Sequence, residues 1–410
     1  MLMSLRGLAL DWRLLAFGFL MSFSSSFGQT YFISLFSAEF RAAFDLSHGG
    51  FGTLYSAATL TSGLLLLWAG GMIDRVDLRI FAAIVLAGIA AASAFASAMT
   101  GPVTLVIVLF LLRFFGQGLA SHTAVTSVAR YADAGVRGRS VSLAALGFPV
   151  GEAVWPTVAV ALIALIGWRW TYGGAGLLTL AVFLPLALLL LATHGRRHTD
   201  LMARTVDEGM EGALRQWTRG EVLRDPTFLW SLTAVLAPSF IVTGILFHQV
   251  YLTESKGWDL SIFATGYVGY AVCQIAVALV AGPAIDRIGA RRVARVYLAP
   301  MVFGLVLLAA SDAVWAGLFF LAMCGATSGA SSTLLGTLWA EIYGVRHLGA
   351  IRALVTACSV VSSALSPALM GWGLDAGITM EAIALACAVY VVLGIGVLWI
   401  LFTGRRLSAT

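Results

Sequence analysis

The chain has 410 residues, of which 60% are hydrophobic and 11% are charged. Soluble domains carry roughly 25% charged residues, so this composition excludes a soluble globular protein, which could not cover its surface. The apolar content also excludes a disordered chain, and four cysteines are too few for a disulfide framework. The remaining class is an all-α membrane protein that crosses the bilayer several times.

Apolar segments of about 20 residues are long enough to cross the hydrocarbon core as helices. Between charged or turn-forming breaks the sequence contains twelve, at residues 14–37, 50–72, 78–99, 102–126, 140–166, 171–193, 227–252, 261–284, 293–311, 314–338, 350–373 and 380–403. We predict two six-helix bundles, 1–193 and 227–410, joined by a cytoplasmic linker over 194–226. A surface helix is expected in part of that linker.

Basic residues orient the predicted spans. Of 25 basic residues, 21 fall at the termini and in one alternating set of connections, and Arg113 lies inside a span. The other set holds only Arg41, Arg169 and Lys256. Because basic residues concentrate on the cytoplasmic side, both termini are predicted to be cytoplasmic. The near-exclusive use of arginine and the absence of asparagine are typical of a GC-rich bacterial genome, which favours a bacterial inner membrane.

The two halves repeat one another. Gly70-x-x-x-Asp74-Arg75 recurs 212 residues later as Gly282-x-x-x-Asp286-Arg287, and Tyr55 meets Tyr267 at the same offset. The segments 27–31 and 247–251 are alike, as are 135–137 and 344–346. Four ordered matches at similar offsets indicate duplication, and a pair of pseudo-symmetric bundles around a central cavity is a transporter architecture.

These motifs resemble the major facilitator superfamily over nearly the whole chain. The segments 70–79 and 282–292 are similar to its loop motif and the echo of that motif, although Asp77 stands where the family has glycine. Arg113-Phe-Phe-Gly116-Gln117-Gly118 resembles its span-four motif, and Gly147-x-x-x-Gly151 its span-five region. Spans one and seven look somewhat like the monocarboxylate and oxalate–formate porters, but the arginine that marks span eight of those porters is missing. The resemblance implies alternating access.

The motif aspartates are candidate conformational switches. A carboxylate beside arginines at an inner helix end can cap a neighbouring helix and pair with a guanidinium. The repeat suggests that Asp74 meets span eleven near Arg352, and that Asp286 meets span five near Arg139. Static anchoring of the loops is the alternative. The predicted switch residues are Gly70, Asp74, Arg75, Gly282, Asp286, Arg287 and Arg291.

Arg113 and Glu152 are the two clear ionisable residues in mid-span. Burying a charge there costs at least about 2.5–3.5 kcal/mol, so each is a functional candidate. Both lie at similar depth on consecutive helices, by the helical rise of about 1.5 Å per residue. Glu152 is therefore the first candidate for proton coupling and Arg113 for holding an anion. A permanent salt bridge between them is the alternative.

Neutral polar residues form stripes on spans one, two, eight and eleven. A stripe on an apolar helix faces protein or water, although helix–helix hydrogen bonding would explain the serines equally well. His248 is a second coupling candidate, whereas His122 is expected to pack against a neighbouring helix. With Arg113, the predicted substrate-binding residues are Gln29, Tyr55, Gln117, Gln249, Tyr267 and Gln274.

The sequence contains no motif for an enzyme, a nucleotide site, a cofactor or a metal. We therefore predict a proton-coupled secondary transporter of a small solute, with an organic anion such as a carboxylate as the expected substrate class. Proton-driven export of hydrophobic compounds is the first alternative, and a transporter-like sensor or assembly factor the second. The expected partners are the solute, protons and the lipid bilayer, with no nucleic acid, and a monomer is expected.

The orientation is directly testable. Reporter fusions after Arg406 should report a cytoplasmic location, and fusions within 38–48 an external one, because the arginine bias sets the orientation. An external reporter after Arg406 would overturn the twelve-span arrangement.

Overall fold

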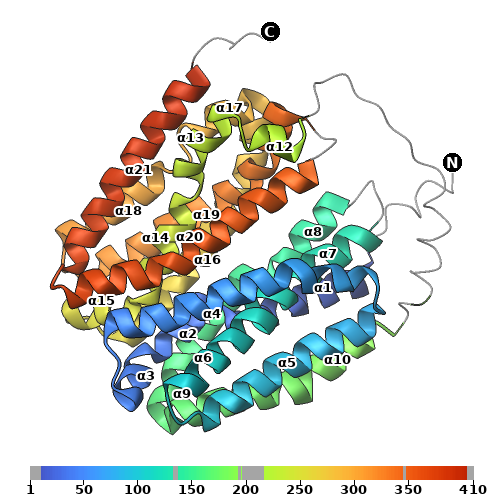
Figure 1. Ribbon diagram of the computed structural model, residues 1–410, viewed down its shortest axis with the longest axis vertical. Coiled ribbons are helices and arrows are strands. Elements are labelled where there is room, and N and C mark those ends of the chain that lie inside the picture. The colour runs from blue at the N-terminus through green and yellow to red at the C-terminus, as the bar shows by residue number, and fades with distance from the viewer. Residues whose placement is uncertain (1–10, 133–136, 193–194, 196–216, 345–347, 404–410) are drawn as a thin grey trace. The chain divides into compact units, whose positions relative to one another are not determined.

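The computed structural model describes residues 11–132, 137–192, 195, 217–344 and 348–403. Throughout these residues the chain is helical, with no β-strand, as predicted. Figure 1 shows the helices, and the chain divides into two units. Unit 1 comprises residues 1–45 and 57–211, and unit 2 comprises residues 46–56 and 212–410. The predicted linker falls largely outside the described residues.

Unit 1 holds the first six spans. Its elements are α1 (Trp12–Ser24), η2 (Ser25–Gly28), α2 (Thr30–Ile33), η3 (Ser34–Phe36), α3 (Ser37–Phe44), most of α4 (His48–Ala69), η4 (Gly70–Asp74), α5 (Leu78–Ala98), α6 (Pro102–Leu111), η5 (Leu112–Ala120), α7 (Ser121–Tyr131), α8 (Arg137–Ala145), α9 (Gly147–Leu178), η7 (Thr179–Phe183) and α10 (Leu184–Leu190).

Unit 2 holds the last six spans and the start of α4. Its other elements are α12 (Arg219–Val222), α13 (Pro226–Val235), α14 (Ala237–Phe247), α15 (Gln249–Ser255), α16 (Leu260–Ile288), α17 (Ala290–Ala294), α18 (Ala299–Ala310), α19 (Val314–Tyr343), α20 (Leu348–Asp375) and α21 (Met380–Thr403).

Nine stretches of the described chain are long and apolar enough to cross a membrane. The stretch Arg139–Leu190 contains two spans, because Gly167 adopts φ 78° and bends the chain where the sequence predicted a loop. The nine stretches therefore contain ten spans. Helix α4 and the interrupted first span bring the total to the predicted twelve.

Span one is not the continuous helix that the sequence predicted. The helix tightens to a 3₁₀ turn over Ser25–Gly28 and is interrupted at Gln29, whose φ of −79° and ψ of 151° are extended. Serine hydroxyls compete for the backbone here, since Ser24 donates to the Met21 carbonyl (3.1 Å) and Ser25 to the Ser22 carbonyl (2.7 Å). Apolar length alone does not reveal such a break.

Aspartates begin several helices. Asp11, Asp77, Asp225 and Asp259 accept hydrogen bonds from the first-turn amides of α1, α5, α13 and α16. Asp77 stands where the superfamily motif has glycine, and its role as the N-cap of α5 explains this difference. In the second half the equivalent residue is Gly289, whose φ of 86° is unfavourable for other residues. The first copy has an N-cap where the second has a glycine turn.

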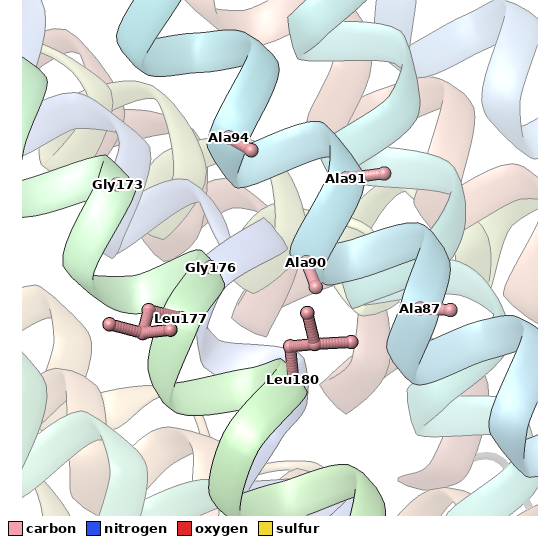
Figure 2. Close-up of a pocket in the computed structure, with 8 residues that line it drawn as sticks. All are labelled: Ala87, Ala90, Ala91, Ala94, Gly173, Gly176, Leu177 and Leu180. Carbon is pink, nitrogen blue, oxygen red and sulfur yellow. The ribbon is translucent and has the colours of Figure 1, made fainter.

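Spans three and six pack through small residues (Figure 2). Ala87, Ala90, Ala91 and Ala94 of α5 lie opposite Gly173, Gly176, Leu177 and Leu180 along a shallow groove. A methyl group on Gly176 would lie 2.9 Å from the Ala90 carbonyl oxygen, so glycine allows the helices to approach. Alanine, glycine and leucine alone line the groove, and we therefore attribute it to helix packing.

The single lysine joins the end of α15 to the α18–α19 connection and to the first turn of α21. Lys256 Nζ lies 2.8 Å from Asp312 Oδ1 and 3.0 Å from Glu381 Oε1, and it also donates to the Ser311 carbonyl. The lysine side chain is only 1% exposed. Burial lowers the pKa of Lys256, but the hydrogen bonds to Asp312 and Glu381 outweigh this and raise it above its ordinary value. The stabilisation is therefore present at neutral pH and is lost as pH rises through that raised pKa.

Lys256→Met should lower the free energy of unfolding by about 2 kcal/mol, because charged hydrogen bonds are lost while the aliphatic stem is kept. Thermal-shift measurements in detergent at pH 7 would show this as a lower apparent Tm. Arg224→Met, which removes an exposed cation, is the control. Equal melting of the two variants would contradict the role assigned to Lys256.

Candidate substrate and coupling site

Arg113 holds the break in span one. It lies on a π-helical segment, Leu112–Ala120, and is 1% exposed. Its Nη1 donates to the Gly28 carbonyl oxygen and to Thr30 Oγ1, both at 3.2 Å. These acceptors flank the interrupted residue Gln29. The guanidinium thus supplies polar partners to irregular backbone where the bilayer offers none.

Two glycines bring span one against span four. A methyl group on Gly28 would lie 2.1 Å from the Leu112 carbonyl oxygen and 2.8 Å from Gly116 Cα. The π-helix and the 3₁₀ turn therefore cross backbone to backbone at these glycines. Single π-helical turns are frequent at functional sites, so both irregular segments mark this crossing as a candidate site.

Glu152 lies on α9, next to the second contact of span one. A methyl group on the preceding Gly151 would lie 2.2 Å from Ser26 Oγ, so the two spans are also in close contact here. The Glu152 Oε2 atom is inaccessible to solvent and has no hydrogen-bond partner in the described chain. One carboxylate oxygen of Glu152 is thus buried, while the residue as a whole is half-buried.

Two contacts of Arg113 are with Gly28 and Thr30, and Glu152 Oε2 has no hydrogen-bond partner among the described residues. Arg113 lies on a π-helical segment and meets an interrupted helix, rather than the ideal helices along which the depths of the two residues were compared. The predicted salt bridge between Arg113 and Glu152 stays a prediction.

An aromatic cluster adjoins Glu152, and the sequence analysis missed it. Trp155, one turn further along α9, lies 5.1 Å from Phe23, 4.7 Å from Phe27 and 6.5 Å from Phe183 between ring centroids. The indole Nε1 is buried without a hydrogen-bond partner in the described chain. The spacing Glu152-x-x-Trp155 could have predicted that the two side chains are neighbours, because residues three apart share a helix face.

Unit 2 carries a set of neutral polar and aromatic side chains. The Tyr267 hydroxyl donates to Gln249 Oε1 at 2.9 Å, which brings two predicted substrate-binding residues together. Tyr270 bonds to Ser328 at 2.9 Å, a contact that the sequence did not reveal. Tyr55 packs against Phe247 with ring centroids 4.6 Å apart.

The two histidines both bond to backbone carbonyls. His122 Nε2 lies 3.0 Å from the Gly70 carbonyl oxygen, and its Nδ1 lies 3.3 Å from Thr126 Oγ1. It therefore packs between helices, as expected. His248 Nε2 lies 3.0 Å from the Pro367 carbonyl oxygen and the residue is 3% exposed, so His248 fixes the end of α14 to α20.

The remaining glutamines are partly buried. Gln29 Nε2 donates to Ser25 at 3.4 Å within span one, and Gln117 follows Gly116 at the helix crossing. Gln274 Oε1, on α16 one turn after Tyr270, is buried without a hydrogen-bond partner among the described residues. These three residues therefore stay candidates for contact with a solute.

The second switch motif is held by a residue outside the motif itself. Glu341, at the end of α19, accepts from the Ala290 amide at 3.0 Å and lies 3.4 Å from Arg291. Asp286 is exposed, as are Arg75 and Arg287, while the side chain of Asp74 lies outside the described residues. Glu341 escaped the sequence analysis because it is far from the motif along the chain. The clamp contacts predicted for Asp74 and Asp286 remain predictions.

Comparison with known proteins decides the family. The profile of the Major Facilitator Superfamily matches residues 18–268 and 229–409. The chain belongs to this superfamily. It is therefore a multi-pass membrane transporter and not an enzyme.

Solved structures of similar fold are also transporters. A bacterial homologue of the human lysosomal transporter Spinster, inward-facing and unoccupied, shares 13% identity, with 97% of this chain and 98% of that chain covered and a TM-score of 0.69. A point mutant of the nucleoside transporter NupG shares 14% identity, with 96% and 100% covered and a TM-score of 0.72. At these identities the likeness establishes the fold. A search of curated proteins gave no match.

Gly28→Ala should destabilise the helix crossing by about 1–3 kcal/mol, because the new methyl group would press on the Leu112 carbonyl. Fluorescence-detected gel filtration after heating would show this as a lower apparent Tm. Gly173→Ala is the matched control, since its methyl group meets no atom closer than 3.8 Å. A Gly28→Ala protein as heat-resistant as the control would contradict the proposed backbone contact.

Proposed function

We propose that the chain is a proton-coupled secondary transporter of a small organic anion, with Glu152 as the proton site. The observation that carries this proposal is the buried Glu152 Oε2 without a partner in the described chain. An ionised carboxylate in such a place lacks compensation, whereas a protonated one is neutral. A group that must change its charge when its surroundings change suits coupling to a proton gradient.

Arg113 supports an anionic substrate. Its Nη1 donates to two neutral oxygen atoms of span one, so the guanidinium is held at the break between Gly28 and Thr30. A planar guanidinium binds carboxylates through two parallel hydrogen bonds. We infer that an anion reaches Arg113 at the break in span one and that Gln117, next to Gly116, lies on the same crossing.

Export of hydrophobic compounds is the second candidate. The cluster of Trp155, Phe23, Phe27 and Phe183 beside Glu152 favours it, because aromatic side chains bind apolar and cationic solutes. The two candidates differ in the role of Arg113. Transport of an anion requires its guanidinium at the site, whereas export of apolar compounds requires only the acid and the rings.

The proposed mechanism is alternating access, with the two units changing which side of the membrane the site faces. In this scheme Asp74 and Asp286 are switches of the inner side, and both termini are cytoplasmic in a bacterial inner membrane. Gln249, Tyr267 and Gln274 of unit 2 stay predicted substrate-binding residues. His248 would be the alternative coupling residue should Glu152 fail.

Glu152→Gln should keep exchange of substrate across proteoliposome membranes but lose accumulation driven by a pH gradient, because the amide cannot release a proton. Arg113→Lys should raise the KM for an anionic substrate at least about tenfold, since lysine cannot make the bidentate contact. A panel of labelled organic anions, neutral solutes and cations would identify the substrate. Glu254→Gln, at an exposed acid, is the control.

Gradient-driven accumulation by Glu152→Gln at the level of the Glu254→Gln control would remove Glu152 from the proton pathway. Normal transport of apolar cations by Arg113→Lys, with no anion transported by either protein, would favour the second candidate.

A further inference from the structure

A cluster of arginines lies in unit 2 where α16 is followed by α17 and α18. It consists of Arg287, Arg291, Arg292 and Arg295. Glu341 lies 3.4 Å from Arg291, and Asp286 adjoins Arg287 in the sequence. Among the described residues, no acid forms an ion pair with Arg292 or Arg295. Four arginines against two acids leave an excess of positive charge, in a connection that the arginine bias predicts to be cytoplasmic.

Arg295 is held against α21. Its guanidinium carbon lies 5.3 Å from the centroid of the Trp399 ring, and a cation over an aromatic face is attracted by the ring. The Nε atom of Arg295 is buried without a hydrogen-bond partner in the described chain, whereas the residue as a whole is half-buried. The guanidinium is therefore fixed in position, while part of the side chain stays accessible to a ligand.

Arg292 lies one helical turn before Arg295. The Arg295 amide donates to the Arg292 carbonyl, and residues at this spacing share a helix face. Arg292 is exposed. Two guanidinium groups without acidic partners thus lie next to each other, and an arginine can bind a phosphate group through two parallel hydrogen bonds. The pair is suited to an anion that carries several oxygen atoms.

The surroundings of the arginine pair are apolar. Val296 follows directly after Arg295, Phe303 lies further along α18, and Ile400 follows Trp399 on α21. All four of these apolar side chains are exposed. Figure 1 shows α17 and the end of α21 at the same end of unit 2, and α18 packs against α21. In a membrane protein such side chains face lipid, and tryptophan favours the level of the headgroups.

We propose that Arg292, Arg295 and Trp399 form a binding site for the headgroup of an anionic phospholipid of the inner leaflet. The phosphate would lie against the two guanidinium groups, and the acyl chains would contact the exposed apolar side chains. Anionic lipids give this leaflet its negative surface potential, and basic pockets between membrane-spanning helices bind their headgroups. The site belongs to unit 2, whereas Arg113 and Glu152 belong to unit 1, so it is independent of the proposed substrate site.

Trp399 can report which lipid is bound. The chain has 12 tryptophans, so the emission of Trp399 is isolated by subtracting the spectrum of Trp399→Phe from that of the parent protein. The purified full-length protein is placed in phosphatidylcholine bilayers that contain brominated phosphatidylglycerol, or brominated phosphatidylcholine at the same mole fraction, because bromine quenches a neighbouring indole. Quenching should show a preference for the anionic lipid of at least about tenfold, since each of the two arginines contributes roughly a factor of five.

Substitutions of the arginines test the origin of this preference. Arg292→Gln combined with Arg295→Gln should reduce it to below about threefold, because both charges are lost. Arg295→Lys should keep most of it, since a positive charge remains beside the phosphate. Arg224→Gln is the matched control, because it removes an exposed arginine of unit 2 that adjoins Asp225, and it should preserve the preference.

The proposal is wrong if the wild type shows no preference for phosphatidylglycerol, or if the double glutamine variant keeps the same preference as Arg224→Gln. Loss of the preference on adding soluble glycerol phosphate would also contradict it, because the site would then bind a free phosphate ester rather than a lipid. The measurement requires no transported solute, so its outcome is separate from that of the Glu152→Gln transport assay.

Discussion

Irregular backbone inside a membrane must find its polar partners within the protein, because lipid supplies none. The helix of span one is interrupted at Gln29. The Arg113 guanidinium donates hydrogen bonds to the Gly28 carbonyl and the Thr30 hydroxyl on either side of the interruption. The close contact of Gly28 with Gly116 and the π-helix around Arg113 follow from the same need. The candidate site is thus located where the first and fourth spans depart from ideal helices.

This arrangement gives Arg113 and Glu152 different surroundings. Arg113 is used at the break, which leaves Glu152 beside an aromatic cluster, with its Oε2 unpartnered among the described residues. An ionised carboxylate that is buried without a hydrogen-bond partner is costly, and the proposed proton site rests on this cost. The proposed coupling therefore depends on the break in span one as much as on the acid itself.

Hydropathy was sufficient to predict the spans, because about twenty consecutive apolar residues match the thickness of the hydrocarbon core as a helix. The bend at Gly167 and the packing role of His122 were also predictable, from a turn signal and from helical phase. The break at Gln29 and the π-helix were not, since both depend on contact between distant glycines. The contacts of Glu341 with Ala290 and Arg291 were not predictable either, because a carboxylate can cap any helix end that the fold brings to it.

In the proposed mechanism Glu152 carries a proton, and its Oε2 has no hydrogen-bond donor among the described residues. Infrared difference spectra of the purified transporter at neutral pH, wild type minus Glu152→Gln, test it without knowledge of the substrate. A protonated Glu152 should contribute the carbonyl stretching band of a carboxylic acid to that difference. A difference that shows only the bands of an ionised carboxylate would contradict it.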